Sequence, residues 1–224
     1  MKPIRLSNTH RRIIAVVALA ILSLALPITS HADFTQIPDP AFQACLNKLA
    51  SKNGWDQPAD FTDITCHNND IRSIEGIRLF VNLKKLSLYK NQLHNAKISG
   101  LGKLAHLNLA GNSLSELHLA NLAALEECYV FNNELTTLSI KNTPRLIKLK
   151  ANNNRLKELH FASSEGLSKL YIFDNKLEKV DMKTLPHLSY FDARHNPMPD
   201  EFYDLLDSIP SLTALHDGNA EDWN

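Results

Sequence analysis

Glycine is scarce in this chain of 224 residues, with seven in all, which argues against a low-complexity coil. An excess of one charge is also missing, because 24 basic and 24 acidic residues cancel to a formal net charge of zero. Four of the basic residues and none of the acidic ones fall in residues 1–32, so the rest holds 20 basic against 24 acidic residues, a net of −4. A mildly acidic body gives no general reason to expect a nucleic-acid partner.

Signatures of catalysis are missing too. Neither G-x-S-x-G nor H-E-x-x-H occurs, and no glycine-rich loop could cradle a phosphate. The ten histidines are scattered, although Glu116 with His118 and Glu158 with His160 recur in step and leave a metal site as a minor alternative. We therefore expect a protein that is not an enzyme, with no catalytic residue, no metal and no cofactor.

No apolar run is long enough to span a bilayer, which takes about 20 residues. Residues 13–26 are almost purely apolar, follow a basic segment and end at Pro27. Small residues then occupy the −3 and −1 positions of a cleavage site before Asp33. This pattern predicts that residues 1–32 are a secretory signal peptide and that the mature protein is periplasmic or extracellular, with no membrane span. An uncleaved membrane anchor is the alternative.

The chain is rich in one 21-residue repeat. Its clearest copy has Leu104, Leu107, Leu109, Asn112 and Leu114 in the pattern L-x-x-L-x-L-x-x-N-x-L. Seven copies in step cover residues 61–198, and the first is spaced by 22 residues. The L-x-L alternation predicts a short strand with every second side chain buried. The asparagine side chain can satisfy backbone groups of a buried turn. Its copies are Asn69, Asn91, Asn112, Asn133, Asn154, Asn175 and Asn196.

This pattern resembles that of the leucine-rich repeat family, in particular its bacterial exported members with short units, and the first unit is similar to the internalin type. The resemblance implies an α/β repeat solenoid that is right-handed and curved, with a parallel sheet on its concave face and a mostly non-helical convex side. It also implies a protein or peptide partner. The second half of each unit alternates and is too short for a good helix, so we expect extended chain or short strands there.

Two segments outside the repeats are expected to cap the open ends of the solenoid, which would otherwise expose apolar side chains. In residues 33–60, Asp39 and Pro40 should begin a helix that ends at Asn53 and Gly54. In residues 199–224, a helix should begin near Asp200 and be followed by a degenerate last unit.

The three cysteines have separate expected roles. Cys45 lies on the predicted N-terminal helix and Cys66 at an inward position of the first unit beneath it. In an oxidising compartment we predict a Cys45–Cys66 disulfide, which closes a loop of about 20 residues and contributes roughly 3 kcal/mol on the chain-entropy account. Cys128 replaces a repeat leucine, and we expect a buried, unreactive thiol.

Aromatic and basic side chains gather at positions that should face outward from the concave sheet. Such anchor-rich surfaces occur at interfaces. The alternative is structural, because aromatic residues also favour strands and pack across a sheet. We predict a ligand surface for a protein or peptide, with envelope or host polysaccharide as the alternative ligand. Its residues are Tyr89, Tyr129, Phe131, Lys148, Lys150, Lys169, Tyr171, Phe173 and Tyr190, with those from Tyr129 to Phe173 at the centre.

Overall fold

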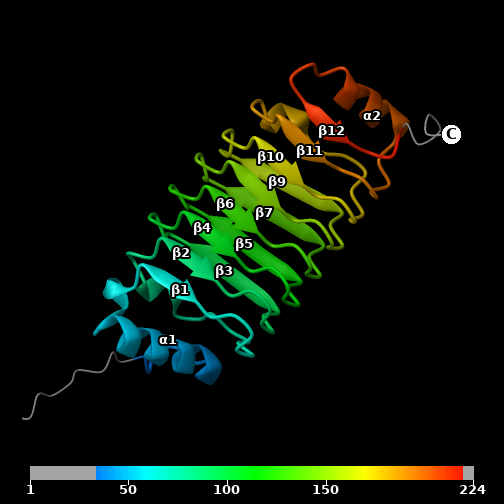
Figure 1. Ribbon diagram of the computed structural model, residues 1–224. Helices are drawn as coiled ribbons and strands as arrows, with labels where there is room; N and C mark the ends of the chain where they lie inside the picture. Colours follow the sequence, from blue (N-terminus) through cyan, green and yellow to red (C-terminus); the bar gives the residue numbers. More distant parts are fainter. Residues whose placement is uncertain (1–33, 219–224) are drawn as a thin grey trace, which may run out of the picture. The chain divides into compact units, whose positions relative to one another are not determined.

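The described part of the chain is a solenoid in which parallel strands from successive turns lie side by side (Figure 1). The computed structural model describes residues 34–218. Each turn contributes one short strand to a long sheet, and the central turns contribute a second strand to a smaller sheet. A helix lies at each end of the stack. The predicted solenoid with helical caps is confirmed.

The long sheet has eight parallel strands in the order β1-β2-β4-β6-β8-β10-β11-β12. The strands have three residues each, and the middle side chain of each repeat strand is buried, as the L-x-L alternation predicts. They are β1 (Asp63–Thr65), β2 (Lys85–Ser87), β4 (His106–Asn108), β6 (Glu127–Tyr129), β8 (Lys148–Lys150), β10 (Lys169–Tyr171), β11 (Tyr190–Asp192) and β12 (Thr213–Leu215).

The register of the long sheet follows the repeat. Glu127 pairs with Lys148, and Lys148 with Lys169, so each step across the sheet equals 21 residues along the chain. The first step is 22 residues, from Asp63 to Lys85. Because the step keeps each repeat position in a straight row, side chains of one position lie beside each other in neighbouring turns. The sequence period is therefore also the period of the outer surface.

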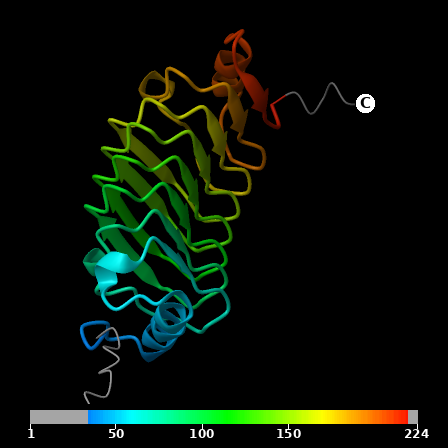
Figure 2. The same cartoon turned by 60° about the vertical axis from the view of Figure 1, so that its left-hand side comes forward.

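The second sheet has four parallel strands, formed by the second half of the units. They are β3 (Asn95–Ser99), β5 (Glu116–Ala120), β7 (Thr137–Lys141) and β9 (Glu158–Ala162). The prediction of short extended segments here is confirmed. Two 3-10 turns, η2 (Ile77–Leu79) and η3 (Met182–Thr184), occur in the units before and after this sheet. Figure 2 shows the successive turns repeating the same outline.

After the long-sheet strand of each repeat unit, the chain bends where one residue adopts the left-handed backbone conformation. In the third unit that residue is Gly111 (φ 68°), and in the fourth it is Asn132 (φ 55°). Glycine and asparagine tolerate this region better than most residues, which explains their recurrence. The residues that end the long-sheet strands in this way are Asn68, Lys90, Gly111, Asn132, Asn153, Asp174 and His195.

The repeat asparagines form a ladder inside these bends. The Asn133 amide donates to the carbonyl oxygens of Val130 (3.0 Å) and Leu109 (3.1 Å), and its oxygen accepts from the Leu114 N–H (3.0 Å). Two of the three partners belong to the preceding turn, so each asparagine ties its own turn to the one before. Asn69 is the exception: it is exposed and donates to its neighbour, the His67 carbonyl oxygen. The prediction that Asn69 is a buried rung is wrong, because its turn has no repeat before it.

The N-terminal helix α1 (Pro40–Asn53) is tied to the first turn by one carboxylate. Asp39 accepts the Phe42 N–H at 2.8 Å as the helix cap. Its other oxygen accepts the N–H groups of Arg72 (2.8 Å) and Ser73 (2.9 Å). A 3-10 turn, η1 (Pro58–Asp60), follows before β1. At the other end, α2 (Asp200–Asp207) precedes β12.

The cysteines lie as predicted. Cys45 of α1 forms a disulfide with Cys66 of the first turn, with 6.1 Å between their Cα atoms. Cys128 is free and fully buried, and burial raises the pKa of its thiol to about 12. A neutral, buried thiol is a poor nucleophile, so Cys128 acts as a small apolar core residue.

The signal peptide predicted at residues 1–32 lies outside the described residues. Among residues 34–218, no helix has the length and apolar character needed to cross a membrane.

Candidate functional site

The outward side of the long sheet is here called the long-sheet face. Each unit places three side chains on it: the first and third residues of its strand and the residue two positions further on. In the sixth unit these are Lys169, Tyr171 and Phe173. Tyr129 and Tyr171 are partly exposed on this face and do not enter the core. The inside–outside assignment from the sequence is therefore confirmed for both tyrosines.

Five side chains from β6, β8, β10 and β11 contact one another in a row across the long-sheet face. The ammonium group of Lys150 lies 5.0 Å from the ring centre of Tyr171 and 5.9 Å from that of Tyr129. Lys148 lies 5.6 Å from the Tyr129 ring. The rings of Tyr171 and Tyr190 lie 4.9 Å apart. These five residues, with the exposed Lys169 at the start of β10, are called the tyrosine–lysine cluster.

A second row, just beyond the strand ends, carries Phe131, Asn152, Phe173 and Arg194. The Arg194 guanidinium lies 5.8 Å from the ring centre of Phe173. It is held there by Asp192, which accepts two hydrogen bonds from it at 2.9 and 2.8 Å and is itself only 3% exposed. Sequence reasoning did not include Arg194 and Asp192 among the site residues. The available signal was their spacing of two in extended chain at the end of β11, which places both side chains on one face.

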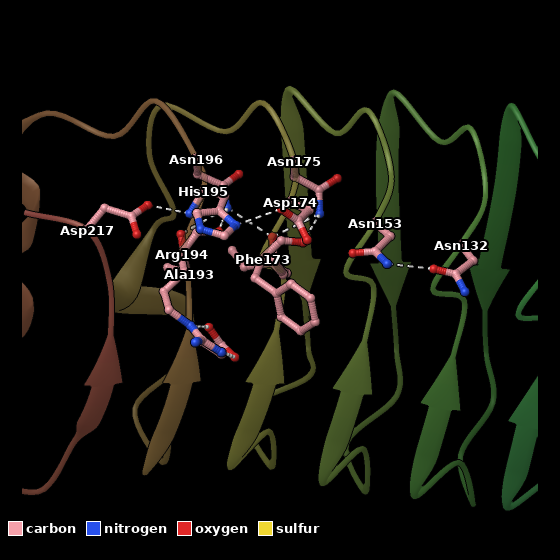
Figure 3. Close-up of polar contacts among 12 residues, drawn as sticks. Asn132, Asn153, Phe173, Asp174, Asn175, Ala193, Arg194, His195, Asn196 and Asp217 are labelled. Atoms are coloured by element: carbon pink, nitrogen blue, oxygen red, sulfur yellow. Dashed lines mark hydrogen bonds and ion pairs between the residues drawn. The ribbon is translucent and has the colours of Figure 1, made fainter.

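A border of polar side chains runs along the edge of the long sheet, next to the second row that contains Phe173 and Arg194 (Figure 3). Asn153 donates to the amide oxygen of Asn132 at 2.7 Å. His195 Nδ1 lies 2.8 Å from Asp174 Oδ1, and the His195 backbone N–H donates to Asp217. Apart from Asp217, these residues occupy the left-handed bends, so the same backbone feature that turns the chain also aligns their side chains from turn to turn.

Tyr89 is separate from the tyrosine–lysine cluster. It belongs to the second turn, and β4 lies between its strand and β6. Its ring meets His67 edge-on at 5.9 Å and lies 5.3 Å from the Lys90 ammonium group. The structure thus brings together eight of the nine predicted ligand residues on neighbouring turns, with Phe131 and Phe173 in the second row, and leaves Tyr89 apart.

The carboxylates of the long-sheet face each have a basic neighbour. Asp63 lies 3.4 Å from Lys85, and Glu127 lies 3.4 Å from His106. Asp174 and Asp192 are paired with His195 and Arg194, as described above. Among the ion pairs of residues 34–218, none involves Lys148, Lys150 or Lys169. The long-sheet lysines without a carboxylate partner among these residues are therefore Lys148 and Lys150 of β8 and Lys169 of β10, with Lys90 apart from them in the second turn.

Two tyrosines of the cluster hold their protons more tightly than free tyrosine. Burial, followed by the hydrogen bond and the negative charge of Glu127, raises the pKa of Tyr129 to about 12. Burial and the charge of Asp192 raise the pKa of Tyr190. Both hydroxyl groups are neutral near pH 7 and can donate as well as accept a hydrogen bond. The cluster thus offers rings, neutral hydroxyls and ammonium groups, a combination that suits binding.

The fold of this chain is similar to that of several solved bacterial proteins. The chain matches no family model and no curated protein. Its structure is similar to YopM of Yersinia enterocolitica (23% identity, TM-score 0.54) over 76% of this chain. It is also similar to internalin C2 of Listeria monocytogenes (22% identity, TM-score 0.51) over 81% of this chain and 94% of that protein. The chain has the leucine-rich repeat fold.

This leucine-rich repeat chain covers only 41% of the length of the Yersinia enterocolitica YopM chain. A second YopM structure, described as that of a leucine-rich effector protein from Yersinia pestis, is 26% identical over 61% of this chain and 38% of its own length, with a TM-score of 0.49. The likeness to the Yersinia enterocolitica YopM chain and to internalin C2 shows the architecture alone: a right-handed, curved leucine-rich repeat solenoid with the long sheet on its concave side. Function has to be argued from the surface of this chain.

Proposed function

We propose that this protein is an exported, non-catalytic binding scaffold that recognises a protein or peptide partner through the tyrosine–lysine cluster. The single observation that carries the proposal is the continuous contact of Tyr129, Lys148, Lys150, Tyr171 and Tyr190 across four neighbouring strands. Tyrosine supplies a large contact area at low entropic cost and is enriched at protein interfaces.

The rigidity of the support favours the same function. The cluster stands on strands whose middle residues, Cys128, Leu149, Leu170 and Phe191, are all fully buried. The asparagine ladder holds successive turns in register beneath it. Side chains presented by a rigid sheet lose little freedom on binding, which lowers the cost of association.

Site-specific photocrosslinking tests this function. A benzoylphenylalanine residue replaces Tyr190 at the border of the cluster, or His118 on the outward side of β5 as the matched control. Both proteins are irradiated in an extract of the cells or medium in which the protein occurs. We expect a discrete adduct from position 190 whose mass glycosidase leaves unchanged, whose tryptic peptides include sequences foreign to this chain, and whose yield Tyr171→Ala lowers.

Two outcomes would contradict the proposal. Equal labelling from positions 190 and 118 would mean that the long-sheet face has no binding preference. An adduct whose mass glycosidase reduces to that of the unlinked protein, with no foreign tryptic peptide, would favour polysaccharide as the ligand.

Export is tested separately by mass spectrometry of the protein isolated from its natural source. We expect a mature N-terminus at Asp33, and an intact N-terminus at Met1 would contradict cleavage.

A further inference from the structure

The lysines of the tyrosine–lysine cluster stand out from the other charges of the long-sheet face. The four carboxylates of that face are each engaged by a basic side chain, and Arg194 is neutralised by Asp192. Lys148, Lys150 and Lys169 remain with no carboxylate partner among the described residues. Positive charge thus collects on two neighbouring strands of a body whose residues 33–224 have a net charge of −4.

The spacing of these three lysines suits an extended peptide that carries negative charge. Lys148 and Lys169 are register partners on neighbouring strands, which lie roughly 4.8 Å apart. Lys148 and Lys150 are separated by two residues, or roughly 6.6 Å along the strand, which is also the distance between alternate residues of any extended peptide. An extended segment with acidic side chains at alternate positions therefore matches Lys148 and Lys150, and Lys169 lies to one side.

The tyrosine rings hold these ammonium groups in place before any ligand arrives. Lys150 lies between the rings of Tyr129 and Tyr171, at 5.9 and 5.0 Å from their centres, and Lys148 lies over Tyr129. A cation resting on a ring face is partly ordered but keeps hydrogen-bond donors free for a carboxylate. Ordering before binding reduces the entropy that a ligand must overcome.

We propose that the tyrosine–lysine cluster selects an acidic, extended peptide segment, whose aspartate or glutamate carboxylates bind Lys148, Lys150 and Lys169 while its backbone or apolar side chains cover Tyr129 and Tyr171. This inference rests on the proposed function and adds the chemistry of the partner. Arg194 takes no part, because its charge is already satisfied by Asp192. The polar border (Figure 3) also carries the carboxylate of Asp217, which accepts only a backbone N–H there. Acidic residues of a ligand are therefore favoured at the opposite ends of the strands, where Lys148 and Lys169 lie.

Calorimetric titration with defined probes tests the proposal. The first probe is a synthetic peptide of about a dozen residues with glutamate at every second position and tyrosine and serine between, and its control has glutamine in place of glutamate. The third probe is polygalacturonate, which carries the same carboxylates on a sugar chain. We expect the glutamate peptide to bind the mature protein about tenfold more tightly than either control, and more weakly as salt rises.

Variants locate the binding. The triple change Lys148→Gln, Lys150→Gln and Lys169→Gln should weaken the glutamate peptide about tenfold. The matched control is the triple change Lys97→Gln, Lys141→Gln and Lys157→Gln, which removes three exposed lysines in and beside the second sheet and should leave binding unchanged. Circular dichroism and thermal unfolding check that both variants fold.

Three other outcomes would contradict the proposal. Equal loss in the two lysine variants, or no saturable binding of any probe, would overturn it. Equal or tighter binding of polygalacturonate would exclude selection of a peptide. If both peptides bind equally, and Tyr171→Ala weakens both while the lysine changes weaken neither, acidic selectivity is wrong but peptide binding by the cluster stands.

Discussion

The two sheets of this protein arise from one repeat and enclose one core, yet their outer faces differ. The strands of the second sheet have five residues each, against three in the long sheet, so each strand offers three outward positions for an aromatic residue against two. Their outward residues are nevertheless Asn95, Lys97, Ser99, Glu116, His118, Ala120, Thr137, Ser139, Lys141, Glu158, His160 and Ala162. None is a tyrosine or phenylalanine.

This difference bears on why the long sheet is rich in aromatic residues. If strand preference alone placed them, the longer strands would carry them at least as often. Instead Tyr129, Tyr171 and Tyr190 gather on neighbouring strands of one sheet and contact lysines there. A surface role for these side chains explains the asymmetry better than strand packing does, and the following predictions test each side of the comparison.

The largest expected effect comes from substitutions in the hydrophobic core that the two sheets share. Leu149 lies under the long sheet and Leu138 under the second sheet, and both are fully buried. Alanine at either position leaves a cavity in the same core, so each change should lower the free energy of unfolding by about 2–5 kcal/mol. Urea denaturation measures both. A cost well below 1 kcal/mol for Leu138→Ala alone would mean that the second sheet does not share the core.

The next effect concerns the asparagine ladder between the sheets. Asn133→Ala removes the partners of two carbonyl groups and of the Leu114 N–H, all buried, and should cost about 1–3 kcal/mol. Asn69 occupies the same repeat position but is exposed, so Asn69→Ala is the matched control and should cost less than about 0.5 kcal/mol. Thermal unfolding compares the two. Similar losses would show that the ladder is not what stabilises the turns.

The contrast between Asn133 and Asn69 also shows what the repeat pattern can predict. Period and alternation indicate which side chains point inward and which outward, and Leu149, Tyr129 and Tyr171 lie as predicted. The pattern treats every copy alike, however, and the ends of a stack are not alike. Each ladder asparagine bonds to the turn before it, so the first copy has no such partner.

Side-chain pairing is the part that the sequence did not reveal. The repeat places Asp192, Arg194, Asp174 and His195 on the long-sheet face, but pairing depends on which rotamers neighbouring turns allow. Those pairs decide which charges of the face remain available to a ligand. That the predicted ligand residues bind a partner stays a prediction.

Substitution of outward side chains of the two sheets should affect stability less than these core and ladder changes do. Tyr171→Ala removes the contacts with Tyr190 and Lys150 but opens no core cavity, so the free energy of unfolding should fall by about 1 kcal/mol or less. His118→Ala on the second sheet is the control and should be within about 0.5 kcal/mol of the unaltered protein. Only Tyr171→Ala should weaken the photocrosslinked adduct. A loss for Tyr171→Ala as large as that for Leu149→Ala would show that Tyr171 is a core residue.

The smallest effect is a dependence of stability on alkaline pH, to which Tyr129 of the long-sheet face contributes. Burial and Glu127 raise the pKa of Tyr129 to about 12, whereas an unfolded tyrosine ionises near pH 10. Below pH 10 both states keep the proton and the contribution of Tyr129 to stability is fully present. Between about pH 10 and 12 the unfolded chain loses the proton first, so ionisation favours unfolding and stability falls.

Absorbance at the tyrosinate band and urea denaturation across this pH range measure the effect. Tyr129→Phe should remove one ionisation near pH 12 and make the alkaline loss of stability less steep. Glu127→Gln should lower the pKa of Tyr129 only in part, because burial is the larger cause and remains. If the ionisation that Tyr129→Phe removes lies near pH 10 and the stability profile is unchanged, the Tyr129 hydroxyl group is in open solvent and does not contact Glu127.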